Sequence, residues 1–423
     1  MTSSPPKYVS IAPLLKLLSN PPPRDNTVKA EDIALAFSRT FENELNPTQL
    51  AALLTLLHST GKDRHPDVVA RCAEAMRDAA VQVDKRKLRD VVRKKAKVLG
   101  GYRGGLCDIV GTGGDAHSTF NISTTASIVA SPILRMAKHG NKAQTSMSGS
   151  ADVLTAISPR APSIESLTAE RLPEVYEHTN YAFLYAPNFH PGMKYAATVR
   201  RELGLRTIFN LMGPLANPVE DHIEARVVGV AYQELGPVFI QALQMTGATK
   251  AMVVCGQEDL DEISCAGETN CWLLREVENP KYNGGQQTQA DDDDTSDDES
   301  PPKYLSRLET FALSPAAFGL PSHPLSQVGG GGLPKQNAAV LMSILRNERP
   351  PDDPILHFVL MNVAALLVVS GACDADVCES GEVITERGPG GGRWKEGVKK
   401  ARWCIESGRA LEEFEKFIAF TNR

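Results

Sequence analysis

The hydrophobic positions in the first quarter of the chain recur at helical spacing. Between residues 28 and 98, apolar side chains repeat every three or four positions, which places them on one face of a helix. Break signals such as Asn46-Pro47 separate four such groups. The groups are Ile33, Phe37, Phe41 and Leu45; Leu50, Leu53, Leu54 and Leu57; Val68, Val69, Cys72 and Met76; and Leu88, Val91 and Val92. We therefore expect a small helical domain over residues 28–100, with one face free for a partner subunit.

From residue 106 the pattern changes to short apolar runs that alternate with helical stretches. The runs are Leu106–Val110, Ile133–Ala137, Ala182–Tyr185, Arg226–Val230 and Lys250–Cys255. The helical stretches are Ser123–Ala130, Met193–Leu203, Leu235–Met245, Asn337–Arg346, Ile355–Val369 and Trp394–Phe420. Strands that alternate with helices predict an α/β domain over residues 101–423, with a largely parallel central sheet flanked by helices. Pro132 should end or kink the helix that begins near Ser123.

Two segments lack either pattern. Residues 1–27 are rich in proline and contain no sustained apolar stretch, so we expect an N-terminal tail that is not a secretory signal. Residues 283–302 are rich in Gly, Gln and Asp and contain almost no apolar side chain. Such a segment cannot bury enough surface to order itself, and we expect a disordered acidic insert between two strands.

Composition and charge narrow the class of protein. A chain of 423 residues with 42% hydrophobic residues can fill a sizeable core, and its length argues for two domains or for one large domain with an appendage. The net charge is −6, but seven acidic residues lie between Asp291 and Glu299, so the rest is nearly neutral. That balance disfavours a nucleic-acid-binding surface.

The cysteines and the longest apolar run indicate where the chain works. None of the eight cysteines forms a C-x₂-C pair, which favours reduced thiols in the cytoplasm. The run between Pro354 and Ser370 is too short to span a membrane and contains His357 and Asn362, so a buried core helix is expected.

The chemistry begins at the turn Gly111-Thr112-Gly113-Gly114-Asp115, which follows an apolar strand. Three glycines let the backbone approach an anion closely, and the helix that follows adds its dipole. The turn lacks the Gly-Lys-Ser/Thr of a Walker A loop and the spacing of a dinucleotide fingerprint. A phosphate cradle and a purely structural tight turn both fit this motif taken alone.

Three further polar clusters follow predicted strands or begin helices. Thr119–Thr125 carries more hydroxyl and amide groups than a helix cap needs, which suits a sugar phosphate and a metal. Lys138–Lys142 and Ser146–Asp152 follow the next strand, where Lys138 can neutralise phosphate charge. Gln257–Ser264 contains Asp261 and Glu262, and adjacent carboxylates after a strand suit Mg²⁺, although a charged surface loop would look similar.

These clusters, in this order, resemble the anthranilate phosphoribosyltransferase family. Two further motifs reinforce the resemblance, Phe183–Pro187 with His190-Pro191 and Arg206–Asn210 with Gly213–Pro218. It covers nearly the whole chain apart from the tail and the acidic insert. It implies a glycosyltransferase (pentosyltransferase) of tryptophan biosynthesis, in which the anthranilate amine displaces diphosphate from 5-phosphoribosyl 1-diphosphate. It also implies a helical contribution from about residues 192–215 and a homodimer formed through the helical domain.

The resemblance also implies roles for individual residues. Two Mg²⁺ ions would be held by Ser123, Asp261 and Glu262. Anthranilate would meet Gly111, Asn141 and Arg200, with His190 and Pro214 as further candidates. The phosphoribosyl diphosphate would lie on Gly111, Gly114, Asp115, Thr119, Asn121, Ile122, Ser123, Thr124, Lys138, His139, Gly140, Asn141, Lys142, Ala143, Gln144, Thr145, Ser146 and Ser150.

No strong acid or base is expected among these residues. An aromatic amine is neutral at pH 7 and needs no base to activate it. Lys138, Asp261 and Glu262 would act by charge and position while diphosphate leaves. A guanidinium such as that of Arg200 suits a carboxylate through paired hydrogen bonds.

Two other functions remain open at this point. A pyrimidine nucleoside phosphorylase shares the fold class but uses free phosphate, whereas Asp261-Glu262 and Gly213–Pro218 favour a diphosphate substrate. A non-catalytic binding protein on the same scaffold would tolerate loss of the metal ligands, which are present here. A type-I phosphoribosyltransferase is disfavoured because Asp352-Asp353 follows Pro350-Pro351 instead of an apolar strand.

Overall fold

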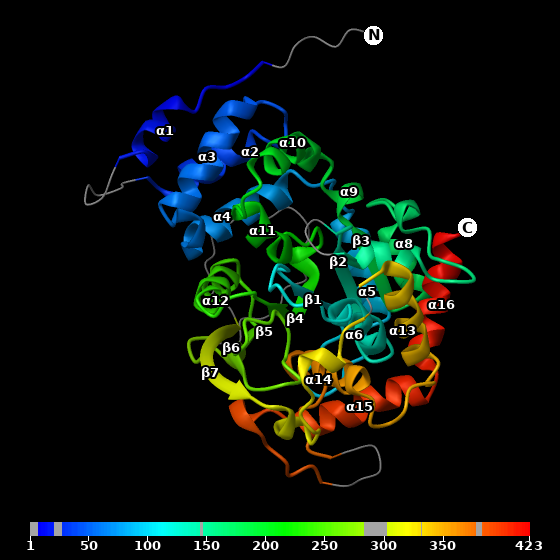
Figure 1. The fold of residues 1–423 in the computed structure, drawn as a ribbon. Coiled ribbons are helices and arrows are strands. Elements are labelled where there is room, and N and C mark those ends of the chain that lie inside the picture. Colours follow the sequence, from blue (N-terminus) through cyan, green and yellow to red (C-terminus); the bar gives the residue numbers. More distant parts are fainter. Residues whose placement is uncertain (1–6, 21–27, 144–146, 283–302, 331, 378–382) are drawn as a thin grey trace.

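A seven-stranded sheet forms the centre of the larger domain (Figure 1). Its spatial order is β3-β2-β1-β4-β5-β6-β7; the strands from β3 to β5 are parallel, and β6 and β7 pair antiparallel. The strands are β1 (Leu106–Gly111), β2 (Arg135–Gly140), β3 (Tyr181–Tyr185), β4 (Ile223–Gly229), β5 (Ala251–Gly256), β6 (Thr269–Glu278) and β7 (Tyr304–Leu313). The predicted largely parallel α/β fold is confirmed.

The computed structural model describes residues 7–20, 28–143, 147–282, 303–330, 332–377 and 383–423. The predicted acidic insert, 283–302, lies outside these residues. The helices are α1 (Ala12–Leu18), α2 (Ala30–Ser38), α3 (Pro47–Ser59), α4 (Pro66–Asp78), α5 (Lys85–Lys94), α6 (Ile122–Ala130), α7 (Ser150–Thr155), α8 (Leu172–His178), α9 (Ala186–Phe189), α10 (Lys194–Leu203), α11 (Ile208–Met212), α12 (Leu235–Met245), α13 (Pro334–Leu345), α14 (Pro354–Ser370), α15 (Trp394–Glu406) and α16 (Arg409–Thr421).

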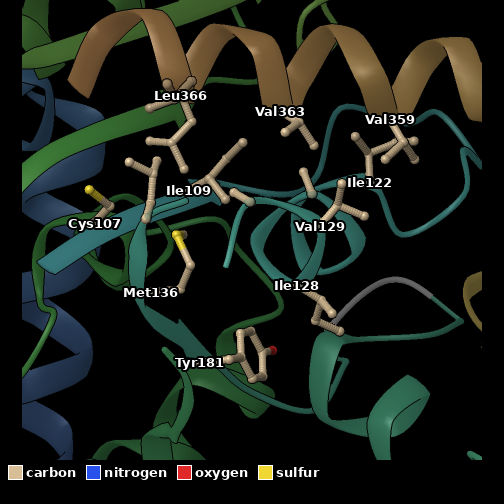
Figure 2. Close-up of a cluster of buried hydrophobic side chains, with 14 of the residues drawn as sticks. Cys107, Ile109, Ile122, Ile128, Val129, Met136, Tyr181, Val359, Val363 and Leu366 are labelled. Carbon is tan, nitrogen blue, oxygen red and sulfur yellow. The ribbon is translucent and has the colours of Figure 1, made fainter. Parts of the chain in front are cut away.

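Two hydrophobic cores lie on opposite faces of the sheet. In β5, Met252 and Val254 belong to one core, and Val253 and Cys255 belong to the other, because successive strand residues point to opposite faces. The first core contains α6 and α14. Figure 2 shows Val359, Val363 and Leu366 of α14 facing the side chains of β1 and α6.

Helix α14 is the long apolar run between Pro354 and Ser370, and nearly all of its side chains are buried. The side chain of Asp353 caps its start by accepting a hydrogen bond from the Leu356 N–H at 2.9 Å. Gly371, at φ +90°, ends it. No helix within the described part of the chain is long and apolar enough to cross a membrane.

The second core joins the helical domain to the sheet. It contains residues of α2, α3 and α4 together with α10, α11 and α12, and it reaches Val228 of β4 and Val253 of β5. The helical domain therefore packs against α10, α11 and α12, and α12 in turn lies against β5 and β6. Because the two domains share this core, the helical domain helps to fix the position of α10 and α11.

Several sequence predictions need correction. The expected tail contains α1, which packs on α3 and buries Ile11 and Leu18 in the helical core. Helix α5 was assigned to the helical domain, but its apolar face packs into the other core, against α8. Its apolar spacing showed that one face is buried and could not show which core buries it.

Other corrections concern where elements end. Helix α2 stops at Ser38, and Phe41 and Leu45 are buried in the turn that follows, where Asn43 has φ +58°. The stretch predicted as one helix from Trp394 to Phe420 is divided into α15 and α16 by Gly408 at φ +73°. Helix α6 ends at Ala130, before Pro132, as expected.

Candidate active site

The candidate site lies where the sheet changes its direction of winding. Strands β2 and β3 extend the sheet from one side of β1, whereas β4 lies on the other side. The segments that follow β1 and β4 therefore diverge at the carboxyl ends of these strands, and open α/β sheets bind ligands at such a point. Gly111, the last residue of β1, pairs with Gly229, the last residue of β4.

Both glycines leave room for the loop after β5. A Cβ atom on Gly111 would lie 2.3 Å from Oδ2 of Asp261, and one on Gly229 would lie 1.5 Å from the Asp261 carbonyl oxygen. A side chain at either position would displace the loop. Gly111 and Asp261 are 150 residues apart in the sequence. The glycine turn and the acidic pair are thus brought together at the ends of β1 and β4.

The glycine turn is held from two sides. Gly113 and Gly114 have φ of +67° and +77°, the left-handed region that favours glycine. The Gly113 N–H donates to Oδ2 of Asp261 at 2.6 Å, and the Gly113 carbonyl accepts from Nη2 of Arg206 at 2.9 Å. A Cβ atom on Gly114 would lie 1.3 Å from Nη1 of Arg206. Arg206 therefore lies against the turn, at the end of the segment that leaves α10.

Three carboxyl groups lie close enough to influence one another. Burial, and then the negative charge of Asp115, raise the pKa of Asp261. Burial, and then the charge of Asp261, hold the pKa of Glu262 well above its usual range. Oε2 of Glu262 is buried and has no hydrogen-bond partner in the described residues. A cation at this place would relieve the repulsion among these carboxylates.

The start of α6 faces the acidic pair. The backbone N–H of Ser123 donates a hydrogen bond to the Glu262 carboxylate, which opposes the upward shift of its pKa. Oδ1 of Asn121 and Oγ1 of Thr124 are buried, and neither has a partner in the part of the chain that the structure describes. These polar atoms do not cap the helix, so they are available to a ligand.

The two remaining predicted residues of this segment lie differently. The side chain of Ile122 belongs to the hydrophobic core and points toward α14 (Figure 2), so only its backbone is available to a ligand. Thr119 is half-buried in the loop before α6.

Lys138 and His139 lie at the end of β2, buried beneath the acidic pair. Burial lowers the pKa of Lys138, and the charges of Asp108, Asp261 and Glu262 act against that shift. Asp108 lies on the neighbouring strand β1 and accepts a hydrogen bond from Nδ2 of Asn217 at 3.0 Å. Asn217 thereby connects the Gly213–Pro218 motif to the floor of the site.

The loop after β2 is closed by Asp152. One oxygen of its carboxylate accepts hydrogen bonds from the N–H groups of Ala143 at 2.8 Å and Gly149 at 3.0 Å. Gly140 lies under Ser150, because a Cβ atom on Gly140 would lie 3.1 Å from the Ser150 Cβ. The predicted residues Asn141 and Lys142 are exposed on this loop. Gln144, Thr145 and Ser146 lie outside the described residues.

The residues predicted to meet anthranilate come from two sides. The guanidinium of Arg200, on α10, lies 5.0 Å from the centre of the Phe209 ring, and burial lowers its pKa. No acidic side chain among the described residues pairs with it. No hydrogen bond or ion pair within the same residues joins it directly to the glycine turn or the acidic pair. Arg206 provides the contact between this segment and the turn.

His190 and Pro214 lie beside His139. The His190 ring is buried, its Nε2 lies 2.9 Å from the Ala216 carbonyl oxygen, and its centre lies 5.2 Å from that of His139. Burial lowers the pKa of His190 to about 4, so the ring is neutral at pH 7. Pro214 is buried in the 3₁₀ turn Gly213–Leu215. His190 therefore packs against His139, near the end of β2.

Comparison with known proteins identifies the family. A model described as "Glycosyl transferase family, a/b domain" matches residues 103–284 and 303–411, and one described as "Glycosyl transferase family, helical bundle domain" matches residues 14–80. The anthranilate phosphoribosyltransferase of Schizosaccharomyces pombe is 35% identical over 94% of this chain and 94% of its own. That of Saccharomyces cerevisiae is 32% identical over 95% and 96%.

The chain belongs to the anthranilate phosphoribosyltransferase family.

Solved structures of the anthranilate phosphoribosyltransferase family share this fold. The enzyme of Saccharomyces cerevisiae, in complex with PRPP and Mg, superposes with a TM-score of 0.75 at 30% identity, covering 98% of this chain and 99% of its own. The enzyme of Thermus thermophilus gives a TM-score of 0.69 at 30% identity, covering 94% and 96%.

Some residues of this anthranilate phosphoribosyltransferase family member were not predicted from the sequence as part of the site. Asp108 carried a signal, since a carboxylate inside an otherwise apolar strand needs a partner. Arg206 and Asn217 were noticed only as parts of motifs. Asn337, on α13, accepts a hydrogen bond from the Asn121 N–H at 3.2 Å, and nothing in its local sequence indicated this.

The chemistry of the acidic pair fits Mg²⁺. Within the described residues, no group of three or more His, Cys, Asp and Glu side chains is arranged to hold a metal by itself. Mg²⁺ is commonly bound through one or two carboxylates, with substrate phosphates and water supplying the other oxygens. The unpartnered oxygen of Glu262, and the burial and mutual repulsion that raise the pKa values of both acids, are compatible with such a shared site.

Proposed function

We propose that this chain transfers the phosphoribosyl group of 5-phosphoribosyl 1-diphosphate to the amine of anthranilate. The products are diphosphate and N-(5-phosphoribosyl)anthranilate, in tryptophan biosynthesis. The observation that carries the proposal is the meeting of the glycine turn and the acidic pair at the ends of β1 and β4, in a chain that belongs to this family.

The phosphoribosyl diphosphate lies, in this proposal, on the turn, on the start of α6 and on the loop after β2. The turn contributes Gly111, Gly114 and Asp115, and the start of α6 contributes backbone N–H groups and hydroxyls. Lys138 places one positive charge in a buried position, where it stabilises charge more strongly than it would in water. The residues so assigned are Gly111, Gly114, Asp115, Thr119, Asn121–Thr124, Lys138–Ser146 and Ser150.

Mg²⁺ dependence belongs to the same proposal, with two ions at Ser123, Asp261 and Glu262. Bound there, Mg²⁺ would neutralise the charge that develops on the leaving diphosphate. The carboxylate oxygens of Asp261 and Glu262 are held in position, because the backbone N–H groups of Gly113 and Ser123 donate hydrogen bonds to these two carboxylates. The fold therefore sets the positions of both acids before a ligand arrives.

Arg200 is proposed to bind the anthranilate carboxylate, next to Gly111 and Asn141. Its guanidinium is partly buried against Phe209 and has no carboxylate partner in the described residues, so its paired donors are free for one. His190 is neutral and held by the Ala216 carbonyl, which suits a residue that shapes the pocket instead of moving a proton.

The assembly and compartment are part of the proposal as well. A homodimer through the helical domain is supported by the exposed side chains of Leu17 and Leu35, which are 48% and 59% accessible on that domain. A domain division at about residue 100 is supported by the two matched models, which cover residues 14–80 and 103–411 apart from 285–302, and by the packing of α10 and α11 on the helical side. A cytoplasmic location is supported by the described cysteines, which are free and buried.

The test is a fluorescence assay of anthranilate consumption. Fluorescence should fall only when protein, 5-phosphoribosyl 1-diphosphate and Mg²⁺ are all present. Unchanged fluorescence with folded protein and all components would refute the proposal. Phosphorolysis of a pyrimidine nucleoside by the same preparation would favour the nucleoside phosphorylase reading instead.

A further inference from the structure

A cavity opens at the end of the sheet opposite the candidate active site. Its volume is about 630 Å³, and its floor is formed where β1, β4 and β5 begin. Arg103–Gly105, Ile223-Glu224 and Thr249-Lys250 line this floor, and helix α5 forms a wall. The cavity is therefore separate from the carboxyl ends of the same strands.

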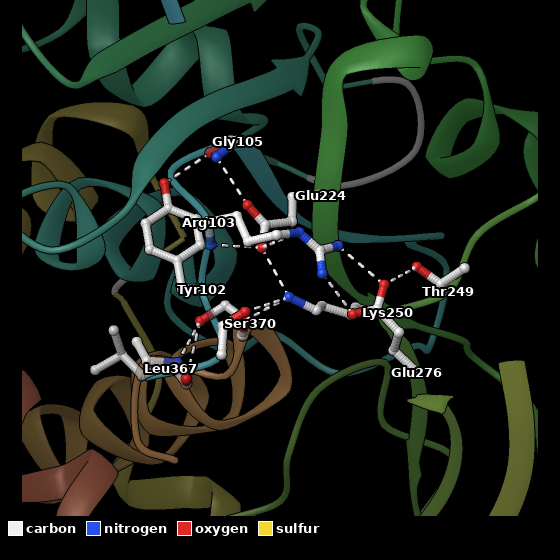
Figure 3. A network of polar contacts seen from close by, with 11 residues as sticks. Tyr102, Arg103, Gly105, Glu224, Thr249, Lys250, Glu276, Leu367 and Ser370 are labelled. Carbon is white, nitrogen blue, oxygen red and sulfur yellow. Dashed lines mark hydrogen bonds and ion pairs between the residues drawn. The ribbon is translucent and has the colours of Figure 1, made fainter. Parts of the chain in front are cut away.

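The floor of the cavity is built from fixed ion pairs (Figure 3). Nζ of Lys250 lies 2.7 Å from Oε1 of Glu224 and donates to the Gly101 carbonyl at 2.6 Å. Arg103 donates to both oxygens of Glu276, at 2.6 and 2.9 Å. Both carboxylates thus have their cations, and these side chains hold one geometry without a ligand.

Positive charge above this floor is only partly matched. Arg226 is 2% exposed and pairs with Glu220 through Nη2 at 2.6 Å. Its other terminal nitrogen, Nη1, is buried and has no hydrogen-bond partner among the described residues. Arg89 and Arg93, on α5, also line the cavity, are exposed, and make no ion pair within those residues.

An unpartnered buried donor and two unpaired arginines are the features expected of a site that binds an anion. Like charges held close together destabilise a fold, and a buried unmade hydrogen bond adds to the cost. Guanidinium groups match phosphate and carboxylate oxygens in paired hydrogen bonds. Val92, Ala96 and Ala248 add apolar surface to the lining, which suits the carbon skeleton of a small organic molecule.

We propose that this cavity binds a small organic anion with more than one phosphate or carboxylate group, at a site distinct from that of the sugar diphosphate. Arg89, Arg93 and Arg226 would bind its anionic groups, and the ion pairs of Arg103 and Lys250 would hold the floor in place.

The test is isothermal titration calorimetry on the full chain, with citrate as the carboxylate probe and fructose 1,6-bisphosphate as the phosphate probe. The cavity variant is Arg89→Ala/Arg93→Ala. The matched control is Arg86→Ala/Lys94→Ala, which removes two positive charges from exposed positions of the same helix that do not line the cavity.

At least one probe should bind the parent chain with a submillimolar dissociation constant. The cavity variant should weaken that binding by about tenfold or more, because charged hydrogen bonds are lost. The control should change it by no more than about twofold, since exposed charges are screened by salt. Anthranilate turnover should remain unchanged in the cavity variant, which separates this proposal from the proposed function.

Three results would overturn the proposal. The first is that neither probe binds the parent. The second is equal weakening in both variants, which would indicate general charge attraction only. If binding is seen only after residues 283–302 are deleted, the acidic run Asp291–Glu299 of the chain itself is the natural occupant, and the proposed small anion is not.

Discussion

The pKa values of carboxyl groups at the two ends of the parallel strands are shifted in opposite directions. At the amino ends, burial would raise the pKa of Glu276, but its hydrogen bond and ion pair with Arg103 outweigh burial and leave the pKa lowered. At the carboxyl ends, burial and mutual repulsion raise the pKa values of Asp261 and Glu262. At the amino ends, the carboxylates of Glu224 and Glu276 are paired with cationic side chains of the chain itself. The acidic pair at the carboxyl ends is instead arranged for a cation that would bind together with a ligand.

Replacing the acidic pair should have the largest effect on activity. Asp261→Asn with Glu262→Gln should reduce kcat by about a thousandfold or more, because stabilisation of the leaving charge is lost. The fold should remain intact, since the replaced groups repel one another in the free protein. Steady-state kinetics and circular dichroism would measure the two effects.

Asp259→Asn is the matched control for that change. It lies in the same loop at φ +59°, a conformation that asparagine tolerates. Activity near that of the parent in the control and in the double variant alike would remove the acidic pair from the mechanism.

Breaking an ion pair at the amino end should instead affect stability. Lys250 and Glu224 are 8% and 7% exposed, so Glu224→Ala leaves a buried ammonium group without its carboxylate. We expect a loss of about 3–5 kcal/mol in the free energy of unfolding. Urea denaturation would measure it.

Asp221→Ala provides the comparison for Glu224→Ala. Its pair with Lys85 is 60% and 65% exposed, and its removal should cost no more than about 1 kcal/mol. Similar losses for Glu224→Ala and Asp221→Ala would mean that the amino-end network is not a structural element.

Arg200 and Arg103 should separate binding from stability. Arg200→Ala should raise the KM for anthranilate by about tenfold with a smaller change in kcat, because it removes a carboxylate contact. Arg103→Ala should lower the melting temperature and leave that KM unchanged, since both guanidinium bonds go to Glu276. A KM effect confined to the sugar diphosphate would contradict the role given to Arg200.

The smallest expected effect is a pH dependence of stability without Mg²⁺. Asp261 and Glu262 have higher pKa values folded than unfolded, so the folded chain binds more protons between those values. Their contribution to stability therefore falls as pH rises from about 4 toward neutrality. The melting temperature of Asp261→Asn/Glu262→Gln, relative to the parent, should rise over the same range. A constant difference across pH would show that these acids are not perturbed.

Local sequence patterns were sufficient to predict much of this fold. Alternating strands and helices revealed β1 to β5, because those strands are buried on both faces and read as apolar runs. The bounds of β6 and β7 were not predicted. Exposed charged positions interrupt the apolar pattern of β7, and residues 283–302 separate β7 from its pairing partner β6 in the sequence. The apolar spacing of α5 predicted the helix but placed it in the helical domain, since an apolar face does not show which core buries it.

The same limit applies to the site. Glycines and acids stand out in the sequence because few structural reasons place them at strand ends. The contact between Gly113 and Asp261 depends on β4 lying beside β1, which is a property of the whole sheet. Arg206 and Asn217 act through long-range contacts of this kind, so their motifs could be noticed without revealing what they touch.

The central claim is that Asp261 and Glu262, at the carboxyl ends, are arranged to bind a cation. The most direct test is calorimetric titration of Mg²⁺–diphosphate into the protein in two buffers with different ionisation enthalpies. Acids with raised pKa values should release protons when the cation binds. The parent chain should therefore release protons at neutral pH, and Asp261→Asn/Glu262→Gln should release none beyond the ligand's own. Binding without proton release, or the same release from both proteins, would contradict the central claim.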